Sequence, residues 1–185
     1  QGITGVGEGG IRGRGGTMIA AIKEHERYIV GKNPLEIEKH WQAMYRWPRW
    51  RGGPILNSAV SAVDIALWDL AGKYYNAPIS ELAGGPFTTN LTAYVSGLRQ
   101  PTLKEQCEAA KQYIDEGYAG IKLFPGDNIE RTVREVRKAA GSGARLFCDL
   151  LWQCRTEEAL RLGRILDDEA YEFLEAPLQL SLIHI

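Results

Sequence analysis

The chain has 185 residues, with 22 lysines and arginines against 23 acidic residues, so its formal net charge is −1. This balance argues against a nucleic-acid-binding domain, which is normally clearly basic. The length suits one full domain, or one small domain plus part of a second. No run approaches the roughly 20 apolar residues of a membrane helix, and the first twenty residues lack the apolar stretch of a signal peptide. We therefore expect neither nucleic acid nor a membrane among its partners.

The three cysteines are Cys107, Cys148 and Cys154. Their number is odd and no pair has the C-x-x-C spacing, so they are predicted to be free thiols of a protein in a reducing compartment, the cytoplasm. The chain has only three histidines. Any metal site would therefore have to use carboxylates.

The first half of the chain is predicted to begin with a strand over residues 1–10, which runs into a loop rich in glycine and arginine. Helices are expected over 18–30 and over 34–46, the second with Pro34 at its first position. A loop with two tryptophans and three arginines follows at 46–54.

The next helix has the clearest pattern. Its apolar residues fall at helical spacing: Ala59, Val63, Ala66, Leu67 and Leu70. Asn57 or Ser58 is expected to cap its first turn. Two glycines and a proline in 82–87 then end the pattern. This break predicts a domain boundary, with residues 1–85 forming the first domain.

Strands alternate with helices in the second half of the chain. The strands are predicted at 91–97, 119–124, 144–150 and 171–177, and Thr156 is expected to cap the last helix. Equivalent strand positions recur about every 26 residues, the spacing of a repeated βα unit. An open doubly wound sheet and half of an eight-stranded barrel both fit. Residues 180–185 do not continue the pattern and are expected to be a non-native tail.

Charged residues follow three of these strands. Lys122 lies at the end of the second strand, Asp149 at the end of the third and Glu175 at the end of the fourth. Reactive side chains of parallel βα folds gather at this edge. Two carboxylates that face one site repel each other unless a proton or a cation lies between them, and oxygen ligands suit Mg²⁺. Lys122 could act as a base or attract a substrate carboxylate. The alternative is that these are solvated loop residues or helix caps.

Two other motifs are less specific. Residues 5–10, GVGEGG, match G-x-G-x-x-G, but no helix opens directly after them. A flexible loop is therefore predicted instead of a dinucleotide site, and a Rossmann-type oxidoreductase is a remote reading. The segment RWPRWR (46–51) is predicted to be either an aromatic, anion-binding substrate loop or a packing loop with solvated arginines.

Residues 51–85 resemble the signature of the mandelate racemase/muconate lactonizing enzyme family of the enolase superfamily. The matching positions are Ala59, Asp64, Ala66, Leu67, Asp69, Gly72, Lys73, Pro78, Leu82 and Gly84. The initial RGGPI is most similar to the sugar-acid dehydratase branch, such as the galactonate dehydratases. The resemblance spans residues 1–179.

The resemblance implies an α+β capping domain over 1–85, followed over 86–179 by the first half of a (β/α)8 barrel, so the chain is expected to be a fragment. It implies Mg²⁺ held by acids at the ends of the third, fourth and fifth strands. Asp149 matches the first ligand and Glu175 the second, although Ala176 departs from the usual glutamate. The third ligand would lie beyond the chain. A homo-oligomer is implied for the full-length protein.

The resemblance also assigns roles to other residues. Lys122 matches the first lysine of a Lys-x-Lys motif, near the substrate carboxylate, but Phe124 replaces the lysine that racemases use as a base. Leu151 replaces the histidine that acts as an acid in galactonate dehydratases. Three residues of the tryptophan-rich loop are candidates to line the substrate: Arg49, Trp50 and Arg51.

These matches predict that the parent protein is a Mg²⁺-dependent acid-sugar dehydratase. Such an enzyme removes the α-proton of a carboxylate substrate to form an ene-diolate, which then expels the β-hydroxyl. One alternative is a non-catalytic fragment with two of three metal ligands. Another is a racemase or cycloisomerase of the same superfamily, which Phe124 disfavours.

Overall fold

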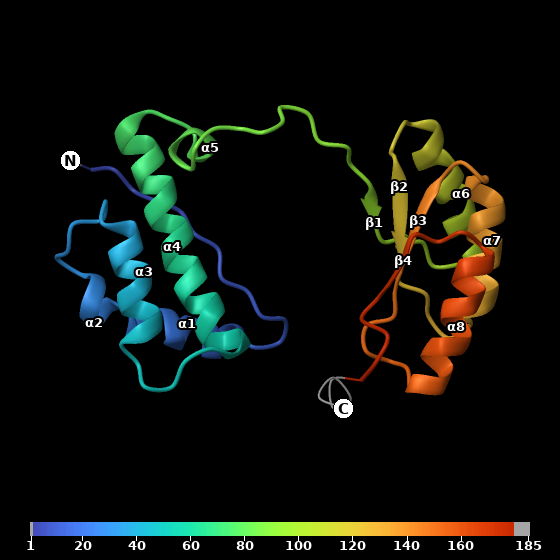
Figure 1. The fold of residues 1–185 in the computed structure, drawn as a ribbon, viewed down its shortest axis with the longest axis horizontal. Helices are drawn as coiled ribbons and strands as arrows, with labels where there is room; N and C mark the ends of the chain where they lie inside the picture. Colours follow the sequence, from blue (N-terminus) through green and yellow to red (C-terminus); the bar gives the residue numbers. More distant parts are fainter. Residues whose placement is uncertain (1, 180–185) are drawn as a thin grey trace. The chain divides into compact units, whose positions relative to one another are not determined.

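The computed structural model describes residues 2–179 and forms two compact units (Figure 1), which divide between Thr89 and Asn90. Each unit is built around its own hydrophobic core. The boundary predicted from the sequence lies after residue 85, in the segment that leads to this division.

Helices make up the regular structure described in the first unit. They are α1 (Gly15–Glu24), α2 (Glu26–Ile29), α3 (Ile37–Arg46), α4 (Gly53–Tyr75) and α5 (Ile79–Leu82). Both α1 and α3 pack against α4. The apolar side chains that they bury include Met18, Met44, Ala59 and Leu67. The helices are thus close to the predicted ranges, and the loop of residues 46–54 lies between α3 and α4.

Two predicted helix starts are wrong. The helix α3 begins at Ile37, so Pro34 precedes it. The helix α4 begins at Gly53 with Gly52 as its N-cap, so Asn57 and Ser58 lie inside it. Gly52 has a φ of +81°, which glycine adopts without strain. Pro54 can lie in the first helical turn because its missing N–H has no helical partner there.

The helix α4 has 23 residues and a mean hydropathy of 1.3 over its most apolar part, so by length and composition alone it could cross a membrane. No stretch of this length and hydropathy was predicted from the sequence. The same properties describe the central helix of a helical domain, and α4 is the helix on which α1 and α3 pack. Asp64, Asp69 and Lys73 interrupt its surface.

The prediction of a strand over residues 1–10 is wrong for the described residues. Residues 2–10 form no strand and run along α4 (Figure 1). A Cβ added to Gly5 or Gly7 would collide with the carbonyl oxygen of Ala66 or Ala62. The glycines are therefore needed for close approach to a helix, and the segment is a packed strip instead of the flexible loop that was predicted.

Two family-signature residues of α4 hold this N-terminal strip. The backbone N–H of Val6 donates to Oδ2 of Asp69 at 2.7 Å. Lys73 donates to the carbonyl of Thr4 at 3.0 Å and to Oδ2 of Asp69 at 2.6 Å. The hydrogen bond from Lys73 is the main cause that lowers the pKa of the Asp69 carboxyl, and the hydrogen bond from the Val6 N–H lowers it further. Asp69 and Lys73 thus have a structural role within this unit.

The second unit alternates strands and helices as predicted. Its strands are β1 (Val95–Ser96), β2 (Gly120–Leu123), β3 (Arg145–Asp149) and β4 (Phe173–Glu175), and its helices are α6 (Leu103–Asp115), α7 (Ile129–Ala140) and α8 (Thr156–Asp168). The four strands are parallel and lie in the order β1-β2-β3-β4. A doubly wound sheet reverses its strand order at a switch point, whereas a barrel does not. The sheet therefore follows the barrel order.

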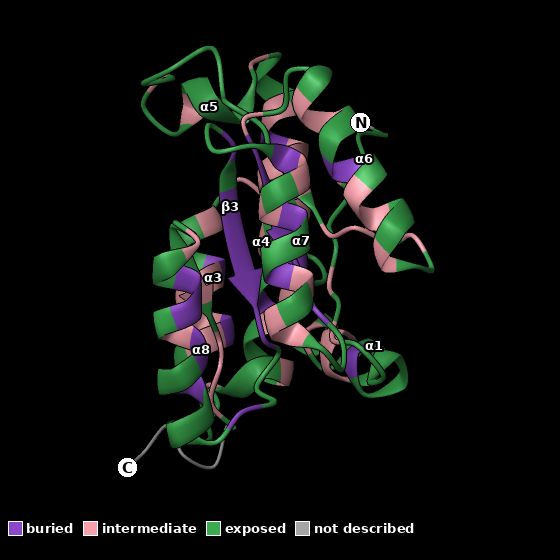
Figure 2. Ribbon diagram, turned by 90° about the vertical axis from the view of Figure 1, so that its right-hand side faces the viewer, coloured by how far each residue is buried: buried purple, intermediate pink, exposed green. Residues whose placement is uncertain are grey.

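The helices α6, α7 and α8 cover one face of this sheet (Figure 1). Ile121 and Leu123 of β2 and Leu146 and Cys148 of β3 are buried in the core that includes these helices. Figure 2 shows β3 buried along most of its length. Because side chains alternate along a strand, the intervening residues of β2 and β3 face the side without helices.

The start of α8 differs from the prediction. Thr156 is its first residue, and Arg155 occupies the N-cap position without a side-chain cap bond. In contrast, Thr102 caps α6 through a reciprocal pair of bonds with Glu105. The tail predicted at 180–185 lies outside the described residues.

Candidate active site

The register of the sheet brings the predicted charged residues together. Asp149 pairs directly with Glu175 across β3 and β4. Lys122 pairs with Phe147, which lies two residues before Asp149 on β3. Residues two apart on a strand share a face. Lys122, Asp149 and Glu175 therefore lie on the face without helices, at the carboxyl edge of the strands.

Lys122 lies between the two carboxylates. Its Nζ is 3.0 Å from Oδ2 of Asp149 and 2.7 Å from Oε2 of Glu175. Lys122 is 9% exposed and Asp149 6%, whereas the Glu175 side chain is 47% exposed. The hydrogen bond that Lys122 donates to Glu175 is the main cause that raises the pKa of Lys122, and burial opposes it. This ion pair is partly desolvated, so its geometry matters more than that of a surface pair.

Backbone N–H groups hold the Asp149 carboxylate and the ends of β3 and β4. The N–H of Leu151 donates to Oδ1 of Asp149 at 2.9 Å, which leaves Oδ2 to contact the ammonium group of Lys122. The N–H of Leu150 donates to the carbonyl of Glu175 at 3.0 Å, and the N–H of Trp152 to that of Ala176 at 2.7 Å. These bonds join the ends of β3 and β4 beyond the last regular residues.

Three non-glycine residues at this edge have left-handed backbone: Leu151 with a φ of +47°, Trp152 with +61° and Ala176 with +43°. Such conformations are uncommon for residues with a Cβ and concentrate at functional sites. Ala176 stands where the family motif usually has glutamate. The strand ends therefore carry strain beside the charged cluster.

The donor set fits a hard divalent cation. Mg²⁺ is bound through one or two carboxylates, and water or substrate oxygens fill its other positions. Asp149 and Glu175 already converge on one positive charge, the ammonium group of Lys122. Among residues 2–179, no group of three or more histidine, cysteine or acidic residues is placed to hold a metal. This part of the chain thus offers two candidate ligands, Asp149 and Glu175.

An aromatic layer lies on the same face, one rung toward the amino ends of the strands. Phe147 stacks on Phe173 with ring centroids 4.7 Å apart, and Tyr94 meets Phe147 edge-on at 5.1 Å. This layer was not predicted from the sequence, although Phe147 and Phe173 each precede a predicted metal ligand by two residues, the spacing that puts them on the same face.

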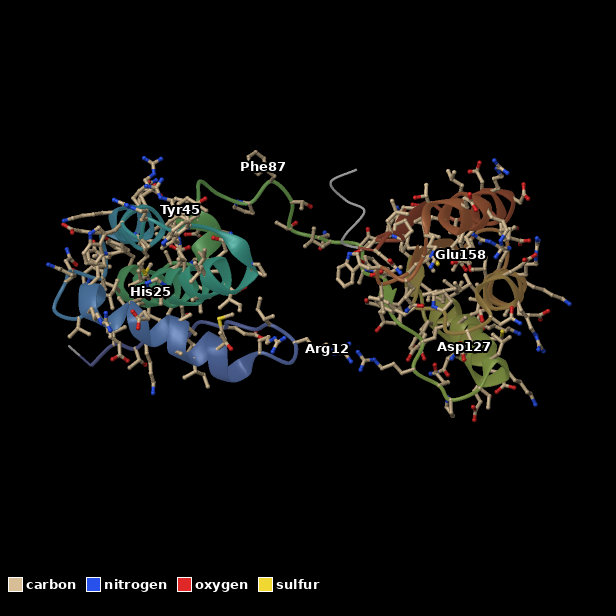
Figure 3. The ribbon with its side chains drawn as sticks, turned by 90° about the horizontal axis from the view of Figure 1, so that it is seen from below. Arg12, His25, Tyr45, Phe87, Asp127 and Glu158 are labelled. Atoms are coloured by element: carbon tan, nitrogen blue, oxygen red, sulfur yellow. The ribbon has the colours of Figure 1, made fainter. Side chains whose placement is uncertain are left out.

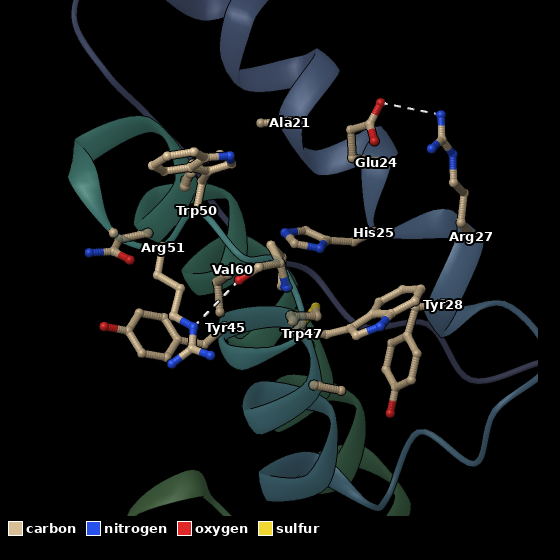
Figure 4. Close-up of a pocket in the computed structure, with 16 residues that line it drawn as sticks. Ala21, Glu24, His25, Arg27, Tyr28, Tyr45, Trp47, Trp50, Arg51 and Val60 are labelled. Carbon is tan, nitrogen blue, oxygen red and sulfur yellow. Dashed lines mark hydrogen bonds and ion pairs between the residues drawn. The ribbon is translucent and has the colours of Figure 1, made fainter.

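The predicted substrate loop belongs to the first unit. Trp50 and Arg51 line a cavity of about 500 Å³ that His25, Tyr28 and Trp47 also line (Figure 4), whereas Arg49 does not. His25 lies between α1 and α2, and Tyr28 belongs to α2. Burial lowers the pKa of His25. The structure thus groups two of the three loop residues in an aromatic cavity.

Two known domain families match successive parts of the chain. Residues 1–84 match "Mandelate racemase / muconate lactonizing enzyme, N-terminal domain", and residues 105–183 match "Enolase C-terminal domain-like". The chain therefore belongs to the mandelate racemase/muconate lactonizing enzyme family of the enolase superfamily. Its two units are a capping domain and part of the barrel.

Curated relatives include galactonate dehydratases. A D-galactonate dehydratase family member from Pseudarthrobacter chlorophenolicus is 36% identical over 151 residues, which are 78% of this chain and 36% of that protein. A D-galactonate dehydratase from Cronobacter sakazakii is 46% identical over 94 residues, 51% of this chain and 25% of that protein. The chain thus spans about a third or less of the length of these relatives.

Solved structures share the fold over nearly the whole chain. An enolase superfamily member from Agrobacterium tumefaciens is 29% identical with a TM-score of 0.87, over 97% of this chain and 48% of that one. The 3,6-anhydro-D-galactonate cycloisomerase from Zobellia galactanivorans is 30% identical with a TM-score of 0.86, over 96% and 51%. Both dehydratases and a cycloisomerase are therefore similar to this chain.

Proposed function

We propose that the whole protein containing this chain is a Mg²⁺-dependent dehydratase of acid sugars. The observation that carries the proposal is the convergence of Asp149 and Glu175 on the ammonium group of Lys122 at the carboxyl edge of a parallel sheet. The galactonate dehydratases among its relatives support the substrate class.

In this proposal Asp149 and Glu175 hold the metal. When bound, Mg²⁺ supplies positive charge that stabilises the negative charge developing on the substrate carboxylate as the α-proton leaves. The Leu151 N–H keeps Asp149 oriented. Lys122 is buried and held by Asp149 and Glu175. In this proposal its ammonium group also attracts the substrate carboxylate, and its low-dielectric position strengthens that attraction.

The neighbouring strand ends limit the proton chemistry. Phe124 and Leu151 carry no group that can accept a proton, so Lys122 is the titratable cation at the described ends of β2 and β3. A racemase that works from both faces of its substrate needs a second proton carrier. The described residues therefore favour elimination. Cycloisomerisation is the second candidate, because the similar Zobellia structure is a cycloisomerase.

The proposal also includes the compartment and the oligomeric state of the whole protein. The three cysteines are free thiols in the structure, as expected for the cytoplasm. A homo-oligomeric assembly is part of the same proposal. Light scattering of the purified whole protein tests the oligomer.

The decisive experiment measures 2-keto-3-deoxy acid formation by the whole protein with Mg²⁺ over a panel of aldonic and aldaric acids. Turnover of at least one acid is expected, whereas conversion of 3,6-anhydro-D-galactonate to an isomer of the same mass, with no turnover of the open-chain acids, would favour the second candidate. Asp149→Asn should lose activity by several orders of magnitude because it removes a ligand charge. Asp167→Asn is the control, since Asp167 is exposed in the last turn of α8. No turnover across the panel would refute the proposal.

A further inference from the structure

The cavity of the first unit has the size of a small-molecule site. Its volume of about 500 Å³ lies within the range of about 300–1,000 Å³ that such sites have. Its lining residues all lie between residues 21 and 60, in the unit where Figure 3 shows the side chains of His25 and Tyr45. The aliphatic part of its wall is made by α1, α3 and α4, through Ala21, Ala43, Met44, Leu56 and Val60.

Aromatic side chains form the rest of the wall, and one of them is fixed by a buried histidine. The Tyr28 hydroxyl is 3.1 Å from Nδ1 of His40, which is completely buried, and Nε2 of His40 donates to the carbonyl of Asn33 at 2.7 Å. In contrast, Trp47 is 75% exposed and Trp50 is 83% exposed. A ligand in the cavity would take part of these two rings out of water, which favours binding of an apolar group.

One positive charge of the cavity has no acidic partner. The charged residues that line it are Glu24, Arg27 and Arg51, so two arginines face one glutamate. Arg27 pairs with Glu24 at 3.5 Å. Arg51 donates from Nε to the carbonyl of Pro48 at 3.4 Å, and its terminal nitrogens make no hydrogen bond within residues 2–179. The guanidinium group of Arg51 is therefore available to an anion.

His25 adds a polar group to the same cavity. Its imidazole makes no hydrogen bond to the part of the chain that the structure describes, and Figure 4 shows the ring directed toward Trp50. Because burial lowers the pKa of His25, the imidazole is mainly neutral near pH 7 and has one N–H to donate. The cavity thus combines apolar and aromatic walls with a free guanidinium group and a free N–H donor.

We propose that this cavity binds a small aromatic carboxylic acid, with its ring against the tryptophans of the loop and its carboxylate paired with Arg51. A guanidinium group matches a carboxylate through two parallel hydrogen bonds. A polyhydroxylated acid fits less well, since the mainly apolar walls would leave its hydroxyl groups without partners. The inference is independent of the proposed function, because all the residues that carry it belong to the first unit.

The test is calorimetry of the whole protein without Mg²⁺, with 3-phenylpropionate as the probe. Two matched compounds separate its parts: 3-phenylpropionamide keeps the ring without the charge, and propionate keeps the charge without the ring. We expect each to bind at least about tenfold more weakly than the probe. No binding of the probe, or equal binding of the amide or of propionate, would overturn the inference.

The metal distinguishes this site from the charged cluster of the second unit. Binding of the probe that appears only when Mg²⁺ is added would place the carboxylate at that cluster and would overturn the inference. Binding that is the same with and without Mg²⁺ is the expected result. Neither outcome changes the proposed dehydratase activity, which is measured separately as turnover of acid sugars.

Variants of the loop locate the carboxylate. Arg51→Met should weaken binding of the probe about tenfold and leave binding of the amide unchanged. Arg49→Met is the matched control, because Arg49 is an exposed arginine of the same loop that does not line the cavity. Trp50→Ala should weaken binding of the probe and of the amide alike. Unchanged binding in Arg51→Met, or an equal loss in Arg49→Met, would overturn the assignment to Arg51.

Discussion

The two regions that the sequence marked as functional differ in what holds them. The charged cluster of Lys122, Asp149 and Glu175 is placed by the register of a parallel sheet, and its members meet within 3.0 Å. The tryptophan-rich loop of the first unit is held between two helices, and its Trp50 is exposed. A regular sheet converts spacing in the sequence into distances in space, whereas a loop does not.

The largest effect is expected when the central charge of the cluster is removed. Lys122→Met leaves Asp149 and Glu175 close together without their counter-ion, so we expect the protein to lose about 3–5 kcal/mol of stability without divalent ions. Added Mg²⁺ should restore part of this loss, because it binds the folded state. Urea unfolding with and without Mg²⁺ measures both effects.

Lys138→Met is the control for this variant. Lys138 is exposed in the last turn of α7, and its loss should change stability by no more than about 0.5 kcal/mol with or without Mg²⁺. A Lys122→Met protein as stable as the native one, and indifferent to Mg²⁺, would show that the two carboxylates do not share a cation.

A second prediction compares the cores with the loop. Leu146 of β3 is completely buried, so Leu146→Ala should cost about 2–5 kcal/mol through lost burial and the cavity left behind. Trp50→Ala removes an exposed ring and should cost no more than about 0.5 kcal/mol. Guanidinium unfolding of the two variants measures the contrast. A large loss for Trp50→Ala would mean that the loop, like the sheet, is held by packing.

The extent of what the sequence could predict follows from the same contrast. The spacing of about 26 residues located all four strands and the charged residues at their ends, because the βα unit repeats with a fixed geometry. The N-terminal strip was misread as a strand, since alternation with glycine describes extended backbone without saying what lies beside it. Gly5 and Gly7 are required by close contact with α4, a helix that lies about 60 residues later in the sequence.

The left-handed residues at the strand ends were also beyond prediction. Leu151, Trp152 and Ala176 are not residues that favour positive φ. The sheet imposes this backbone through hydrogen bonds between the ends of β3 and β4. Their conformation depends on strand pairing, which a single stretch of sequence does not encode.

A third, smaller effect tests the close contact of the N-terminal strip. Gly7→Ala adds a Cβ that meets the carbonyl oxygen of Ala62, so the strip must move away from α4. We expect a loss of roughly 1–3 kcal/mol, as for other overpacked sites. Gly10→Ala, where a Cβ has open space, is the matched control and should leave stability nearly unchanged. Thermal unfolding of both variants separates packing from flexibility. Equal stabilities would mean that the strip is not held against α4.

The smallest expected effect concerns pH. Hydrogen bonds from Lys73 and from the N–H of Val6 lower the pKa of Asp69 in the folded state. A carboxyl with a lowered folded pKa stabilises the protein above its unfolded pKa, and this contribution disappears as the pH falls through the folded value. Asp69→Asn should therefore lower the Tm slightly at pH 7 and not at a pH below the folded pKa, where Asp69 is neutral in the native protein too. The Tm of both proteins between pH 7 and pH 2.5 measures this. A Tm difference that persists unchanged at low pH would show that Asp69 acts through its shape and hydrogen bonding and not through its charge.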